Sequence, residues 1–249
     1  MMKNLCRMAP PIAVITTAWL ALTPSLGQEQ APPASADRET PPDSEYKPPP
    51  RGAPGGRVGG ASRGSFKVTA SLPKIELLAP EGHAGLTTNP TPVLYFLASQ
   101  QVAWPTQFTI SAPTQPKPIV EVDIPAPRNA GVYGLRVADY HVRLEPGVLY
   151  TWSVSVILNP GARSRDVVAS ASLLRIADDP ALDDAVRTAP VSRRAGLFAR
   201  AGLWYDAVAA AAESAALGQP AALRALIHQA SLAEPANYDL QLASGNRPR

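Results

Sequence analysis

Hydrophobic and polar residues alternate along the middle of the chain, most clearly over residues 150–158. One face of this stretch is apolar, and the intervening residues 151, 153 and 155 carry hydroxyl groups. The apolar face comprises Tyr150, Trp152, Val154, Val156 and Leu158. Because side chains alternate between the two faces of a strand, this pattern predicts a β-strand with one buried face. The turn sequence Asn159-Pro160-Gly161 then predicts that residues 167–176 return as its hairpin partner.

Similar short apolar runs recur between residues 74 and 176, separated by Pro and Gly. Their length and their β-branched and aromatic content are typical of strands. The predicted strands are residues 74–79, 92–98, 106–111, 119–124, 131–137, 148–158 and 167–176. Short strands with frequent turns predict a β-sandwich of the immunoglobulin or fibronectin type over residues 66–177.

Beyond Asp178 the pattern changes to alanine-rich helix. Asp178-Asp179-Pro180 predicts a helix start, with Asp183 and Asp184 near the positive end of the helix dipole, and capping explains these acids better than a calcium loop does. Further helices are predicted at residues 191–201, 203–217 and 221–231, so that residues 178–234 form a helical appendage and residues 235–249 a polar tail.

Two of these helices resemble a single tetratricopeptide-type hairpin. The small and large residues that carry the resemblance are Ala195, Phe198, Gly202, Trp204 and Ala207. A lone hairpin cannot bury its own apolar face, so we expect it to pack on the sandwich or on a partner. Trp204 and Tyr205 are accordingly candidate interaction residues, whereas Gly202 and Ala207 are structural. An ordinary capping bundle is the alternative to a peptide-binding groove.

The sequence Leu144-Glu145-Pro146-Gly147-Val148-Leu149-Tyr150-Thr151-Trp152 resembles the corner of fibronectin type III and related immunoglobulin-like sandwiches. In that family the tyrosine hydroxyl bonds to backbone upstream. The resemblance gives Tyr150 a structural role rather than a catalytic one, and Trp152 is assigned to the core.

Residues 1–27 have the pattern of a secretory signal peptide. Lys3 and Arg7 precede a short apolar run at residues 12–22, and Ser25-Leu26-Gly27 is a small-residue cleavage site. We expect the mature chain to begin near Gln28, outside the cytoplasm. An uncleaved membrane anchor is the alternative, but the apolar run is too short to span a bilayer comfortably.

Residues 28–65 are rich in Pro and Gly, with Tyr46 as their only aromatic residue, which predicts a flexible tether. Arg51, Arg57 and Arg63 recur within it at a spacing of six and are possible interaction residues. The run is interpreted either as a glycine-rich anion-binding loop or as a solvated basic linker, and a third hypothesis is that it attaches the protein to peptidoglycan or another surface polymer. The match of residues 60–64 to the serine hydrolase pattern G-x-S-x-G is rejected, because no strand precedes Ser62.

Charge argues against nucleic acid as a partner. Cleavage of the signal removes Lys3 and Arg7 from the 23 Lys and Arg and nothing from the 20 Asp and Glu, so the net charge falls from +3 to +1. A nucleic-acid binder needs a basic field that neutralises several phosphates. The mature chain also has no apolar run long enough for an integral membrane span.

No arrangement of residues identifies a reaction, a metal site or a cofactor. His83, His141 and His228 show no metal-ligand spacing, and the single cysteine, Cys6, leaves with the signal. A pair of carboxylates could cleave a glycan, but the sequence does not bring any two acids together. The candidates are Glu76, Glu81, Glu121, Asp123 and Asp139.

Taken in order, the run RGAPGGRVGG, the LxPGxxYxW segment, the strand ARSRDVVASASLLRI and the helix AGLWYDAV resemble the bacterial domain of unknown function 928 family. The resemblance covers about Arg51 to Ala233. It implies a secreted protein and transfers no catalytic residue. We therefore expect a non-catalytic protein that binds another secreted or envelope protein or assists surface assembly. An envelope glycan-binding domain or hydrolase is the alternative.

Overall fold

The strands lie where the alternation of the sequence predicts them. The structure, a computed structural model, describes residues 45–49, 55–59, 72–233, 235 and 240–242, all within the unit Glu39–Arg249. The predicted strands are found as β2 (Ile75–Leu77), β4 (Val93–Ala98), β5 (Thr106–Ser111), β6 (Val120–Ile124), β7 (Gly131–Arg136), β8 (Leu149–Val156) and β9 (Val167–Arg175). Each falls inside its predicted range, so this prediction is confirmed.

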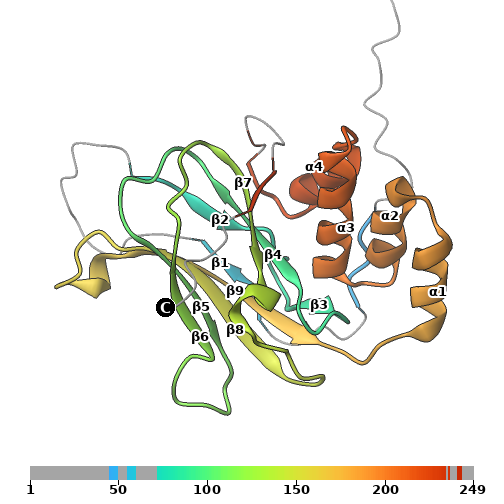
Figure 1. The fold of residues 1–249 in the computed structure, drawn as a ribbon, viewed down its shortest axis with the longest axis horizontal. Helices are drawn as coiled ribbons and strands as arrows, with labels where there is room; N and C mark the ends of the chain where they lie inside the picture. The colour runs from blue at the N-terminus through green and yellow to red at the C-terminus, as the bar shows by residue number, and fades with distance from the viewer. Residues whose placement is uncertain (1–44, 50–54, 60–71, 234, 236–239, 243–249) are drawn as a thin grey trace, which may run out of the picture. The chain divides into compact units, whose positions relative to one another are not determined.

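The strands form two sheets (Figure 1). One sheet has the order β1-β9-β8-β5-β6, with β3 also paired to β9, and the other has the order β10-β7-β4-β2. Strands β8 and β9 pair antiparallel from Leu149 opposite Leu174 to Val156 opposite Val167, which is the predicted hairpin. Both sheets contribute to one hydrophobic core, for example Trp152 from β8 and Phe96 from β4.

Strand β8 shows why the alternation was informative. Tyr150, Trp152, Val154 and Val156 are buried and Thr151 is exposed, as period two requires. Ser155 departs from this pattern, because it is buried although it belongs to the opposite face. Its cross-strand neighbours are Gln107 on β5 and Val168 on β9, and Arg163 from the hairpin loop donates a hydrogen bond to Gln107 Oε1 at 2.9 Å. The loop thus folds back over this end of the face.

The corner before β8 is held by the tyrosine hydroxyl. The backbone N–H of Glu145 donates to Tyr150 Oη at 2.9 Å, which is the upstream backbone contact expected from the motif. Gly147 turns the chain with a φ of 78°, a left-handed conformation that favours glycine. Tyr150 is itself buried.

We expect Tyr150→Phe to lower the free energy of unfolding by about 1 kcal/mol, because the Glu145 N–H loses its acceptor while the ring still fills its site. Urea denaturation measures the change. An unaltered midpoint would show that the corner does not depend on this hydroxyl.

Three short strands were not predicted: β1 (Arg57–Val58), β3 (Gly85–Thr87) and β10 (Leu240–Leu242). Each has only two or three residues, too few to show a period of two. β1 and β3 both pair with β9, and β10 runs parallel to β7. The prediction of a polar tail over residues 235–249 is therefore wrong for residues 240–242.

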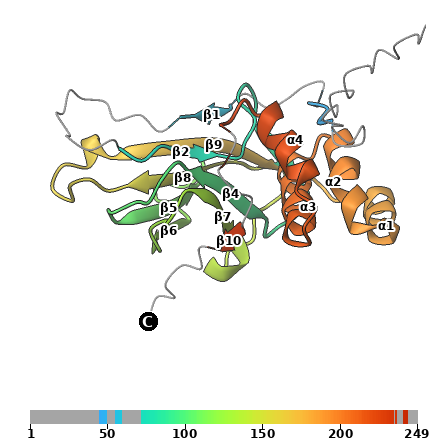
Figure 2. The ribbon, with the colours of Figure 1, turned by 90° about the horizontal axis from the view of Figure 1, so that it is seen from above.

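Four helices follow β9: α1 (Pro180–Thr188), α2 (Val191–Arg200), α3 (Trp204–Ala216) and α4 (Ala221–Gln229). Asp179 caps α1 by accepting hydrogen bonds from the N–H groups of Ala181 and Leu182, as predicted for this acid. Helices α3 and α4 supply core residues continuous with those of the sheets, and α3 lies against β3 and β4 (Figure 2). Helices α2, α3 and α4 are thus part of the same hydrophobic core as the sheets, whereas α1 buries no residue.

The tether predicted over residues 28–65 contains two segments that contact the body. At residues 55–59, β1 adds to the edge of β9, where Val58 lies opposite Ser170. A Cβ at Gly55 would lie 2.5 Å from Ser172 Oγ, and one at Gly56 would overlap the Glu81 carbonyl oxygen, so both positions require glycine. The two glycines permit a close approach of backbone to sheet, and the prediction of a flexible tether does not hold here. The other segment, residues 45–49, is described below.

The predicted signal peptide, residues 1–27, lies outside the described residues. Among the described helices, none combines the length and the apolar character needed to cross a bilayer.

Candidate functional site

The start of α3 joins the helices to the sheets. We call residues 202–208, Gly-Leu-Trp-Tyr-Asp-Ala-Val, the joint. Every joint residue is buried, and Trp204 and Tyr205 are each only 1% exposed. Both were predicted to be possible interaction residues of a hairpin that packs on the sandwich or on a partner, and in the folded chain the hairpin packs on the sheets with both side chains buried. The physical reason is that α3 is covered on several sides, by β3, α2 and α4.

Tyr205 connects α3 to the first sheet. Its hydroxyl accepts a hydrogen bond from Trp152 Nε1 at 2.9 Å and donates to the Ser172 carbonyl at 3.0 Å. The rings of Trp152 and Tyr205 pack edge to face with centroids 6.3 Å apart. Burial raises the pKa of the Tyr205 hydroxyl above its ordinary value, so the group remains a neutral donor. The Tyr205 hydroxyl is thus a structural bridge between α3 and the first sheet.

Gly85 makes room for the Tyr205 ring. A Cβ at Gly85 would lie 2.6 Å from Tyr205 Cε2 and 3.1 Å from two further ring atoms. The ring is fully buried and held by two hydrogen bonds, so it cannot move aside cheaply.

We expect Gly85→Ala to lower the free energy of unfolding by about 2–3 kcal/mol, in the upper range for overpacked cores. Gly82→Ala is the matched control, because nothing lies within 4 Å of a Cβ there. Thermal or urea denaturation of the two variants measures the difference. Equal stability of the two variants would contradict the prediction, because it would mean that β3 and the Tyr205 ring move apart at little cost in free energy.

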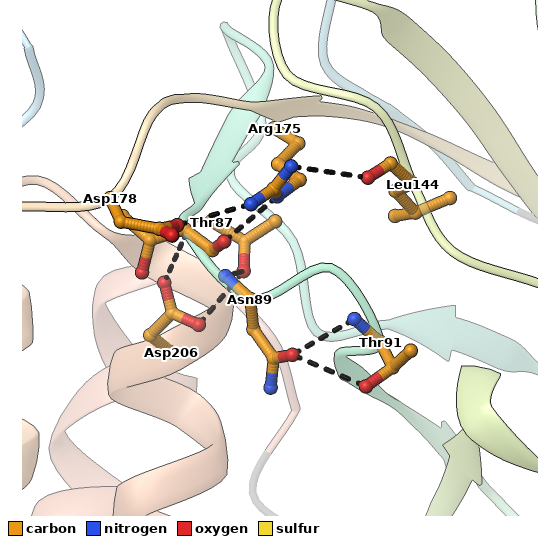
Figure 3. A network of polar contacts seen from close by, with 8 residues as sticks. Thr87, Asn89, Thr91, Leu144, Arg175, Asp178 and Asp206 are labelled. Carbon is orange, nitrogen blue, oxygen red and sulfur yellow. Dashed lines mark hydrogen bonds and ion pairs between the residues drawn. The ribbon is translucent and has the colours of Figure 1, made fainter.

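Asp206 ties the joint to Thr87 at the end of β3 and to Thr88 directly after it (Figure 3). Its carboxylate accepts from the Thr87 hydroxyl at 2.8 Å and from the Thr88 N–H at 2.9 Å. Burial raises the pKa of Asp206 to about 6, although the hydrogen bonds from Thr88 and Thr87 oppose this shift. The site is therefore a buried acid whose charge costs free energy at neutral pH.

Arg175 lies beside this carboxylate network and holds three further partners (Figure 3). Its guanidinium donates to the carbonyls of Thr88 at 2.9 Å and Leu144 at 3.4 Å, and to the Asp178 carboxylate at 3.1 Å. The end of β9 is thus linked to the residues after β3, to the corner before β8 and to the segment that leads into α1. These bonds fix the geometry between sheet and helices.

A segment from the predicted tether covers the other side of Trp204. We call residues 45–49, Glu-Tyr-Lys-Pro-Pro, the strap; it lies beside α2 (Figure 1). The Tyr46 ring meets the Trp204 ring edge to face at 4.8 Å and is parallel to the His83 ring at 5.8 Å. Tyr46 Oη and His83 Nε2 also share a hydrogen bond of 2.9 Å. Trp204 is held from below as well, since its Nε1 donates to the Leu78 carbonyl at 2.9 Å.

The strap backbone donates two hydrogen bonds to the body and passes close to Gly202. The N–H of Tyr46 donates to Gln229 Oε1 at 2.7 Å, and the N–H of Lys47 donates to the Ala199 carbonyl at 3.1 Å. Gly202 lies directly beneath, because a Cβ there would be 3.1 Å from the Lys47 carbonyl oxygen. Gly202 has a φ of 77°, so it serves both as the corner between α2 and α3 and as the floor under the strap.

Burial shifts the titration of both ring partners in the direction of the neutral form. It raises the pKa of the Tyr46 hydroxyl and lowers the pKa of His83 from its ordinary value of 6.5. At neutral pH the Tyr46–His83 contact is therefore a hydrogen bond between two uncharged groups.

Of the three arginines in the predicted basic run, Arg57 lies among the described residues. Arg51 and Arg63 lie outside the described residues. Arg57 lies in β1, and its guanidinium donates to the Ala230 carbonyl at 3.1 Å, at the carboxyl end of α4 where the helix dipole is negative. For Arg57, a role in fastening β1 to α4 replaces the predicted solvated linker.

The acids and histidines considered for catalysis are distributed over several elements of the fold. Glu121 and Asp123 are exposed on β6 and alternate with Val122, as expected for a solvated strand face, and Glu76 pairs with Lys74 at 2.9 Å. His141 ends a short 3-10 helix and His228 lies in α4. Within the described parts of the chain, no three His, Cys, Asp or Glu residues are grouped so as to hold a metal ion.

The fold and the joint define a body of two sheets with a helical layer fixed to one end of the shared core. The chain belongs to the family described as Domain of Unknown Function (DUF928), whose profile matches residues 58–239. No curated protein and no solved structure gives a significant match. The joint, His83, Ala199 and Gln229 all fall inside the matched residues, whereas the strap falls outside them.

Proposed function

We propose that this protein is an exported, non-catalytic interaction module of the cell envelope, and that its partner-binding surface is the strap-covered face around Trp204. The observation that carries the proposal is that a short segment from outside the family match occupies an aromatic site built within it. A surface that holds an extended segment through one ring and two backbone bonds is typical of peptide recognition.

Several features support an interaction role over a catalytic one. Asp206, the described acid with a strongly raised pKa, has its oxygens engaged by Thr87 and Thr88 inside the joint. Tyr205 is equally committed to Trp152 and Ser172. The structural hydrogen bonds of Asp206 and Tyr205 account for the burial of both side chains, so a catalytic role is not needed to explain it.

The architecture of the body supports the same class of function. We propose that the sheets form an immunoglobulin-type sandwich, with β2, β4 and β7 as strands A, B and E and with β5, β8 and β9 as strands C, F and G. The tyrosine corner at Tyr150 then lies at the start of strand F, where this type of fold has it. We also propose that α2 and α3 are related in shape to one tetratricopeptide hairpin.

Export is proposed from the N-terminal pattern of residues 1–27. Amino-terminal sequencing of the protein recovered outside the cytoplasm is expected to begin near Gln28. A product that retains Met1 would remove this part of the proposal.

The function is tested by capture from an envelope fraction with the full mature chain as bait. A Tyr46→Ala bait, in which the strap is loosened, is expected to recover more of a specific protein than the wild-type bait does. A Glu45→Ala bait is the control and is expected to recover as much as wild type, because Glu45 is exposed on the strap. Equal recovery on all three baits and on an unrelated exported domain would contradict the proposal. Recovery of a polysaccharide instead would favour the alternative function, a glycan-binding domain.

A further inference from the structure

We propose that the strap site binds a separate protein partner through an extended segment in which an aromatic residue is followed by one non-proline residue and then by prolines, and that the strap is a displaceable copy of that segment. This inference rests on the proposed function and names the chemistry of its partner. It is carried by the contacts that the strap makes.

The site selects an aromatic residue at one position. The Tyr46 ring packs at nearly a right angle to the Trp204 ring and parallel to the His83 ring, and its hydroxyl shares a hydrogen bond with His83 Nε2. An aliphatic side chain would lose both ring contacts and the hydrogen bond. Tyrosine is thus preferred over phenylalanine by one hydrogen bond, and over leucine by the ring geometry.

The backbone contacts select the residues that follow. Lys47 uses its N–H to reach the Ala199 carbonyl, so proline is excluded at this position because it has no N–H. Pro48 and Pro49 come next and offer no N–H to satisfy, while Pro49 passes 3.6 Å from where a Gly202 Cβ would be. Two prolines hold the segment extended before it binds, which reduces the entropy lost on docking.

The strap is built to be replaced. Glu45, Lys47 and Pro48 are exposed, and only Tyr46 and Pro49 are half-buried, so few side chains hold it in place. A partner segment that repeats these contacts and continues along the surface would gain additional ones. The strap also lies outside the residues that the family profile matches, whereas each residue that binds it lies inside them. The residues that bind the strap thus lie within the family match, and the strap lies ahead of it in the sequence.

The test measures binding of a fluorescein-labelled peptide with the sequence of residues 44–50, SEYKPPP, by fluorescence anisotropy. The hosts are the full mature chain, its Tyr46→Ala variant and the control Glu45→Ala. Because the intramolecular strap competes with the peptide, we expect binding to the Tyr46→Ala host to be at least about tenfold tighter than to wild type or to the control. Lys47→Pro, which removes one backbone donor but keeps the ring, is a second loosened host should Tyr46→Ala fold poorly.

Specificity is measured on the same loosened hosts. A peptide with alanine in place of its tyrosine is expected to bind at least about tenfold more weakly, and adding His83→Ala to the host should weaken the original peptide severalfold. Absence of binding to both loosened hosts, with circular dichroism showing that they are folded, would overturn the proposal. So would binding that does not depend on the peptide tyrosine.

Two further outcomes separate this inference from its premise. If wild type forms dimers that Tyr46→Ala abolishes, the occupant is the strap of a second copy, and the separate partner is rejected. If the capture experiment recovers a partner independent of Tyr46 and the peptide does not bind, the interaction role survives on another surface and this inference fails alone.

Discussion

Replacing Trp204 by alanine is expected to lower the free energy of unfolding by about 3–5 kcal/mol, the range for truncating a large buried aromatic side chain. Trp204 lies at the centre of the joint, 1% exposed, between the Leu78 carbonyl below and the Tyr46 ring above. The substitution removes its packing, leaves the Leu78 carbonyl without its donor and exposes the underside of the strap. Urea denaturation measures the loss.

Trp104→Ala is the matched control, because Trp104 is the same residue type but only partly buried against the core. Its removal should cost about 1–2 kcal/mol, in proportion to its smaller buried area. Denaturation of the wild-type chain also reports on cooperativity. If the wild-type chain melts in two transitions, with the helices unfolding while the sheets remain folded, the claim that the joint unites them in one core would be contradicted.

The second large effect is a dependence of stability on pH that arises from Asp206. Its pKa is raised from 3.8 to about 6 by burial, so the folded state holds the proton more tightly than the unfolded state does. Its contribution is therefore most favourable below the unfolded pKa and is lost as pH rises through about 6. Between about pH 4 and pH 7 the linked loss is about 2 kcal/mol.

Asp206→Asn isolates this contribution, since it keeps the shape of the side chain and removes the titration. The free energy of unfolding of wild type minus that of the variant is expected to fall by about 2 kcal/mol from about pH 4 to pH 7. Asp183→Asn, at an exposed acid in the first turn of α1, is the control and should show no such trend. A difference that stays flat, or rises with pH, would show that Asp206 is not a buried, proton-retaining acid.

The sheets could be predicted from the sequence because their strands are long enough to alternate. In β8 the spacing of Tyr150, Trp152 and Val154 is sufficient to identify the buried face. β1, β3 and β10 could not be predicted in this way, because their pairing is decided by long-range neighbours such as β9 rather than by their own residues.

The motif located the joint, but the sequence left open whether its aromatic residues pack on the sandwich or on a partner. An aromatic pair at the start of a helix looks the same in the sequence whether it meets solvent or a sheet. The composition of α3 could have indicated that the helix is buried. Ala, Val, Trp and Tyr fill ten of its 13 positions, so the helix is apolar on nearly every side. A helix with so narrow a polar face is expected to be buried on several sides.

The docking of the strap was not predicted, because the amino-acid composition of a long segment hides the contribution of a single residue. Residues 28–65 are rich in proline and glycine as a whole, and that average predicts disorder. Tyr46, the single aromatic residue in the stretch, is the anchor that docks it. The bond from Lys47 to Ala199 joins positions far apart in the sequence, and nothing local encodes it.

Hydrogen exchange at the Lys47 amide, measured by NMR on the full mature chain, tests most directly whether the strap occupies the Trp204 face. This amide donates to the Ala199 carbonyl at 3.1 Å. We predict exchange at least about tenfold slower than in an unstructured peptide, with the protection lost in Tyr46→Ala and kept in Glu45→Ala. Exchange at the unstructured rate in the wild-type chain would contradict the account.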